Sequence, residues 1–214
     1  MWNFLNKGNL SRAENLRQGM GALGQKIYRD ASSEVIALVA GLDRLGVGTD
    51  PSERNVHLER VFKHWWQQRK GSVRLTDGLI QWITILHRPR SKDSPPKWWT
   101  VFVVPDERLA TVTQTLKIRT HRKKTFPLFG KVIDTTWKGN DHGIGLRDFL
   151  SNSEAVDELA AQTHDMKVQS YSGRLSAWAI QMDGMFNPMR PYGGETDWQA
   201  LQAVATDLVS RPLG

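Results

Sequence analysis

The chain has 214 residues, 39% of them hydrophobic and nine of them tryptophan, which is enough to build a packed core and excludes a disordered chain. It contains no cysteine, which excludes disulfides, thiolate catalysis and zinc–cysteine sites and agrees with a cytoplasmic protein. No apolar run approaches the roughly 18 residues that a membrane helix needs, and the N-terminal residues lack the apolar core of a signal peptide.

The formal net charge of +7 is distributed unevenly along the chain. Residues 1–59 hold seven basic and seven acidic side chains, residues 60–138 hold seventeen and five, and residues 139–214 hold five and ten, so their net charges are 0, +12 and −5. A basic middle segment is expected of a surface that faces a polyanion or an acidic partner. The alternative is that this segment packs near the acidic C-terminal part.

The first 70 residues are predicted to be helical. A capping box at Ser11 is typical of a helix start, and apolar residues recur at helical spacing over 33–45. Asp50 followed by proline begins a third predicted helix, which we expect to continue as far as residue 70. We therefore interpret residues 1–70 as an N-terminal helical segment that packs on the rest of the chain or on a partner.

The period of the pattern then changes from helix to strand. Segments 79–87 and 98–104 carry β-branched and aromatic residues at both alternating positions, as strands in the middle of a sheet do. The polar, proline-rich residues 88–97 between them are predicted to form an exposed hairpin loop. Two further strands are predicted around 117–122 and 131–138.

The C-terminal third is predicted to contain helices and one hairpin. Ser151 begins a helix with a capping box, residues 166–182 alternate as a hairpin around a Ser-Gly turn, and Thr196 caps the last helix. The predicted fold class is α+β, an antiparallel-rich mixed sheet covered by helices. We expect residues 71–214 to form this α+β domain.

Basic and aromatic side chains gather on the two strands of residues 117–138 and in the loop at 88–97. Phosphate groups are held by such cations, and exposed aromatic rings can stack on unpaired bases. The alternative is a solvated hairpin tip or a charged edge strand. The candidate polyanion-binding residues are Arg119, Arg122, Lys123, Lys124, Lys131, Lys138, Arg88 and Arg90, and the aromatic candidates are Phe126, Phe129 and Trp137.

The glycine-rich turn at 139–145 is the best candidate for an enzymatic site. Its glycines would let backbone amides converge on an anion, and Asp141 could orient His142 as a general base. Asparagine and aspartate beside glycine are also ordinary turn residues. The six histidines show no spacing that would hold a metal ion, so we expect no metal and no cofactor.

These observations predict a non-enzymatic binding or assembly module whose basic segment, residues 60–138, contacts nucleic acid or an acidic protein surface. One alternative is a protein-interaction or structural subunit, including a homo-oligomer, whose basic patch is merely solvated. A third hypothesis is an enzyme that acts on an anionic substrate at the 139–145 turn. We expect no transmembrane segment and no peripheral membrane contact.

Overall fold

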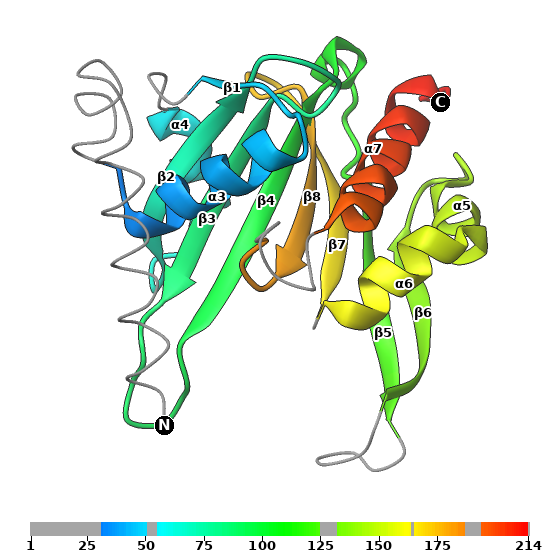
Figure 1. The fold of residues 1–214 in the computed structure, drawn as a ribbon. Helices are drawn as coiled ribbons and strands as arrows, with labels where there is room; N and C mark the ends of the chain where they lie inside the picture. Colours follow the sequence, from blue (N-terminus) through cyan, green and yellow to red (C-terminus); the bar gives the residue numbers. More distant parts are fainter. Residues whose placement is uncertain (1–30, 51–54, 125–131, 164, 187–193, 214) are drawn as a thin grey trace.

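The computed structural model describes residues 31–50, 55–124, 132–163, 165–186 and 194–213. Its centre is one antiparallel sheet of eight strands in the order β1-β2-β3-β4-β8-β7-β5-β6 (Figure 1). The strands are β1 (Thr49–Asp50), β2 (Gln68–Leu75), β3 (Trp82–Arg88), β4 (Lys97–Pro105), β5 (Lys117–Lys124), β6 (Val132–Asn140), β7 (Met166–Tyr171) and β8 (Ala177–Asp183).

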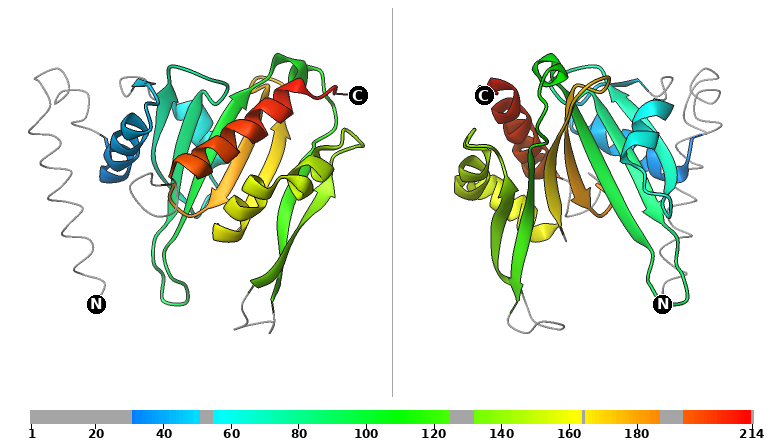
Figure 2. Two further views of the ribbon diagram at one scale, coloured as in Figure 1. Left: turned by 45° about the vertical axis from the view of Figure 1, so that its right-hand side comes forward. Right: turned by 180° about the vertical axis from the view of Figure 1, so that it is seen from behind.

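Helices lie on both faces of this sheet, but unequally. The helices are α3 (Ser33–Arg44), α4 (Val56–Phe62), α5 (Leu146–Asn152), α6 (Glu154–Gln162) and α7 (Glu195–Ser210), and a short 3₁₀ helix spans Glu107–Ala110. The helices α3, α5, α6 and α7 cover one face, whereas α4 lies on the opposite face over β2 and β3 (Figures 1 and 2). The α+β class and the antiparallel sheet are therefore confirmed.

Two apolar cores follow from the alternation of side chains along the strands. The larger core packs α3, α6 and α7 on the sheet and includes Leu42, Phe102 and Leu201. The smaller core lies on the other face, where Phe62 of α4 packs near Trp99 of β4. The strands β3 and β4 contribute to both cores, which confirms that they are central.

The N-terminal segment differs from the prediction. The helix predicted over 33–45 is confirmed as α3, which Ser32 caps by accepting a hydrogen bond from the backbone N–H of Val35. The predicted continuation of a helix to residue 70 is wrong, because α4 ends at Phe62 and the following residues enter β2. Buried Val73 and exposed Arg74 alternate there as in a strand.

Helices therefore do not occupy the whole of residues 1–70, since the described part also holds β1 and the start of β2. The predicted capping box at Ser11 lies outside the described residues. The division into segments at residue 70 stays a prediction, although β2 runs across this position.

The C-terminal elements agree more closely with the prediction. The hairpin is formed by β7 and β8, and the last helix is α7, with Trp198 and Leu208 buried. The predicted cap at Thr196 is wrong, because α7 begins at Glu195 and Gly194 is its N-cap. The helix predicted to begin at Ser151 is instead divided into α5 and α6, because Ser153 adopts an extended conformation between them. Ser151 lies within α5.

A buried carboxylate joins the end of α7 to the sheet. Asp106 follows β4 and accepts hydrogen bonds from Arg108 Nε (2.8 Å) and Trp178 Nε1 (3.0 Å). Arg108 also donates to the carbonyl oxygens of Leu208 (3.1 Å) and Arg211 (2.7 Å). Burial by itself would raise the pKa of Asp106, but the hydrogen bonds from Arg108 and Trp178 outweigh it and hold the pKa below the ordinary carboxyl value.

We expect Asp106→Asn to destabilise the protein by roughly 2 kcal/mol at neutral pH, because the buried carboxylate loses its charge-assisted hydrogen bonds from Trp178 and from the exposed Arg108. The folded pKa of Asp106 lies below the unfolded value of about 3.9. Its contribution to stability is therefore present above that value and is lost as the pH falls through the folded pKa. Urea unfolding at pH 7 and below about pH 4 measures both effects. The exposed Asp93 provides the control substitution Asp93→Asn, and an equal cost for both variants would contradict this role.

Candidate functional site

The face of the sheet opposite α3 and α7 carries a row of cations. Side chains alternate along β5, so Ile118 and Thr120 are buried while Lys117 and Arg119 are exposed on the other face. Arg119 is directly opposite Lys138 of β6 and Lys167 of β7. We call Lys117, Arg119, Lys138 and Lys167 the basic row.

Like charges lie directly opposite one another in the basic row. Side chains directly opposite on adjacent strands are about 5 Å apart at Cβ, and like charges in such pairs destabilise a sheet. Burial and the charge of Lys117 lower the pKa of Lys167, and Asp183 only partly opposes this. Within the described parts of the chain, no carboxylate forms a salt bridge with any member of the row.

The basic row lies on the open part of the sheet. The helix α4 covers this face only over β2 and β3, and no described helix lies over β7, β5 and β6 there (Figure 2, right). Lys117, Arg119 and Lys138 are therefore accessible to a ligand from the side opposite the main core, and Lys167 is half-buried beside them.

A cleft of about 610 Å³ adjoins the basic row. The strand β5 pairs with β7 only at residues 117–119. At the next residue, the side chain of Thr120 makes the hydrogen bonds to β7 in place of the backbone. Its Oγ1 accepts from the N–H of Met166 (2.9 Å) and donates to the carbonyl oxygen of Met166 (3.3 Å). Beyond this point the cleft is lined by Arg88, Pro95, Pro96, Lys97, Thr120, His121, Arg122, Asp165 and Asp183.

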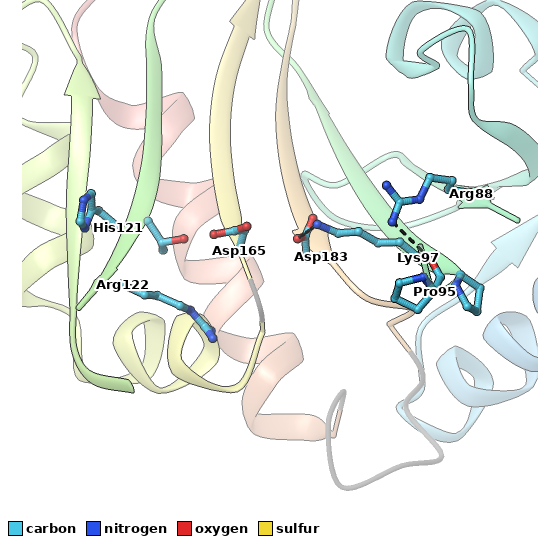
Figure 3. A pocket seen from close by; sticks show the side chains of 9 residues that line it. Arg88, Pro95, Lys97, His121, Arg122, Asp165 and Asp183 are labelled. Atoms are coloured by element: carbon cyan, nitrogen blue, oxygen red, sulfur yellow. Dashed lines mark hydrogen bonds and ion pairs between the residues drawn. The ribbon is translucent and has the colours of Figure 1, made fainter. Parts of the chain in front are cut away.

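Two aspartates lie between basic walls in this cleft (Figure 3). The side chain of Asp183 is only 5% exposed, and Lys97 Nζ lies 2.5 Å from its Oδ2. Burial raises the pKa of Asp183 above the ordinary carboxyl value; Lys97 opposes this rise and the neighbouring carboxyl of Asp165 adds to it. The charge of the cleft therefore becomes more positive when Asp183 takes up a proton.

The basic candidates from the sequence do not form one face. Arg119 and Lys138 lie together in the basic row, and Arg88 lines the cleft while Arg90 is exposed in the hairpin after β3. Arg122 also lines the cleft, but its Nη2 donates to the carbonyl oxygens of Ala160 (2.6 Å) and Ala161 (3.1 Å) near the end of α6. The backbones of Lys123 and Lys124 belong to β5, and Lys131 lies outside the described residues.

The aromatic candidates have other places. Trp137 is buried under the helices, where its Nε1 donates to Asp157 Oδ1 of α6 (3.3 Å). It therefore cannot meet a ligand on the open face. Phe126 and Phe129 lie outside the described residues.

The glycine-rich turn is built around Asp141. Its Oδ1 accepts from the N–H of Gly143 (3.2 Å) and its Oδ2 from the N–H of Arg147 (3.0 Å). Burial would raise the pKa of Asp141, but these bonds hold it below the ordinary value. His142 is exposed, with its ring beside the Asn140 amide rather than the Asp141 carboxylate. This geometry is that of a turn before α5.

Sequence reasoning did not include Lys117, Lys167, Asp165 and Asp183 among the site residues, and it placed Lys97 only in the basic loop at 88–97. A signal for Lys167 exists, because it alternates with the apolar Met166 and Val168 in the predicted hairpin. The pairing of β7 with β5 that brings it next to Arg119 is not visible in the sequence. The pairing of Asp183 with Lys97 likewise depends on the contact between β4 and β8.

Comparisons with protein-family models, with curated proteins and with solved structures found no match for this chain. Within the described residues, no group of three or more His, Asp or Glu side chains is placed to hold a metal ion. The helices described in the structure do not include one with both the length and the hydrophobicity needed to span a bilayer.

The free energy of unfolding should fall as the pH rises from about 4 to 7, and we expect this fall to be smaller in the Asp183→Asn variant than in the unsubstituted protein. The folded pKa of Asp183 is raised, so its contribution is present while it is protonated and is lost as the pH rises through the folded pKa. Asparagine has no proton to release. Urea unfolding across this range measures the difference between the two proteins. The exposed carboxylate of Asp148 offers the control Asp148→Asn. Parallel plots of unfolding free energy against pH for all three proteins would show that burial does not raise the pKa of Asp183.

Proposed function

We propose that this protein binds a polyanion through the basic row and the adjoining cleft, and that nucleic acid is the class that fits best. The observation that carries the proposal is the direct register of Lys167, Arg119 and Lys138 on a part of the sheet that the described helices leave open. Phosphate groups are held by such cations irrespective of the base sequence.

The cost of the basic row supports this proposal. Cations on adjacent strands raise the free energy of the folded protein when nothing binds to them. A series of phosphates above the row would remove this repulsion and would release counterions from the nucleic acid. The row extends over three adjacent strands, which is a distance of roughly 10 Å. A ligand with regularly repeated negative charge therefore suits it better than a single anion does.

The cleft adds further cations beside the row, together with the carboxylates of Asp165 and Asp183. Arg88, His121 and Arg122 line it, while Lys97 is largely occupied by Asp183. The raised pKa of Asp183 means that the cleft repels phosphate less at lower pH. An acidic protein surface is the competing ligand class, and it would meet the same cations.

We expect Arg119→Gln/Lys138→Gln to weaken the binding of a labelled oligonucleotide and to reduce its salt dependence. Each phosphate contact contributes about 0.7 to the slope of log affinity against log salt concentration for a single strand. The double variant should therefore reduce the magnitude of this slope by about 1.4. Fluorescence anisotropy titrations between about 50 and 200 mM salt measure both quantities.

The matched control is Arg44→Gln/Arg174→Gln, which removes the same net charge from exposed arginines at the end of α3 and in the turn between β7 and β8. Its binding should stay close to that of the unsubstituted protein. Equal weakening by both double variants would contradict the proposal, as would the absence of binding at low salt. Binding of an acidic protein without binding of nucleic acid would favour the protein-interaction function.

A further inference from the structure

The turn after α4 exposes a large aromatic surface. Trp65 is 90% exposed and Trp66 is 36% exposed. The ring of Trp66 lies 5.4 Å from that of Trp99, which belongs to the smaller core. The turn is therefore on the same face of the sheet as the basic row. Burial of a tryptophan is strongly favourable, so an almost fully exposed one requires an explanation.

The backbone of this turn is held by hydrogen bonds. Gln67 is buried, its Oε1 accepts from the N–H of His64 (2.8 Å), and its own N–H donates to the carbonyl oxygen of His64 (3.0 Å). The rings of His64 and Trp66 stack with centroids 5.4 Å apart and planes within 5° of parallel. We call His64, Trp65 and Trp66 the aromatic ledge. Because its backbone is already held in a turn, the backbone needs little further ordering when a ligand binds.

Two cations join the aromatic ledge to the cleft. The guanidinium carbon of Arg88 lies 5.9 Å from the centre of the Trp66 ring, and Lys97 Nζ lies 5.3 Å from the centre of the Trp99 ring. Both cations line the cleft, and Lys97 also pairs with Asp183 there. Arg88 and Lys97 form the wall of the cleft nearer to the aromatic ledge, and His121 and Arg122 of β5 form the opposite wall (Figure 3). The strands β4 and β5 are three positions apart in the sheet, which is roughly 15 Å.

We propose that the ligand is single-stranded nucleic acid, with an unpaired base stacked on Trp65 while the phosphates of neighbouring nucleotides follow the cleft to the basic row. This inference rests on the polyanion-binding function proposed above. A single strand offers both of the groups that this face can bind, phosphates and open π faces. A duplex hides its bases in the stack, and acidic proteins and polyphosphate carry no bases at all.

The test compares Trp65→Ala with Trp65→Phe on three probes: a labelled single strand of about 15 nucleotides, the duplex of the same sequence, and inorganic polyphosphate as a competitor. We expect Trp65→Ala to weaken single-strand binding about 5- to 150-fold, because loss of one stacked base has this effect. Trp65→Phe should retain most of the affinity. Polyphosphate carries no bases, so its inhibition constant should be the same for all variants.

A matched control is Leu79→Ala, which removes another exposed apolar side chain, 38% accessible, from a different loop and should leave all affinities unchanged. Circular dichroism spectra verify that each variant folds. An unchanged single-strand affinity in Trp65→Ala, or an equal loss for all three probes, would overturn the stacking role and leave the polyanion-binding function intact. If neither nucleic acid nor polyphosphate binds, the polyanion-binding function itself is wrong and the stacking role falls with it.

Discussion

The register of β7, β5 and β6 is the constraint on which the proposed site depends. Ile118 and Val168 form a fully buried cross-strand pair under the helices, and Trp137 is buried in the same layer. Because side chains alternate between the two faces, this buried set directs Arg119 and Lys167 to the open face. A slip by one residue would bury the cations and expose the core, so the packing of the helices also determines the charge of the opposite face.

The second constraint is the point at which β5 separates from β7. The hydroxyl of Thr120 satisfies the backbone N–H and carbonyl of Met166, so the ladder can end there without leaving buried polar groups unpaired. Beyond this point, the guanidinium of Arg122 donates hydrogen bonds to two backbone carbonyl oxygens near the end of α6. The cleft is thus a consequence of an ordered end of strand pairing, with basic side chains on both of its walls.

Local patterns predicted several elements correctly. The helical spacing of α3 and α7 and the strand patterns of β3, β4, β7 and β8 can be recognised within short windows, because each element buries one stripe or both faces. The same reasoning extended the helix at α4 too far, because Trp65 and Trp66 have the spacing of core residues. The structure places them in a turn that Gln67 holds, with Trp65 facing solvent.

The sequence by itself determined the α+β class, the main apolar segments and the concentration of positive charge between residues 60 and 138. These properties depend on composition and on spacing between near neighbours. Only the tertiary structure decided which charges meet: Lys167 joins Arg119, Asp183 binds Lys97, and Arg122 turns to carbonyl groups of α6. The physical reason is that antiparallel pairing between distant segments is selected by burial of the whole core, which no local pattern of residues contains.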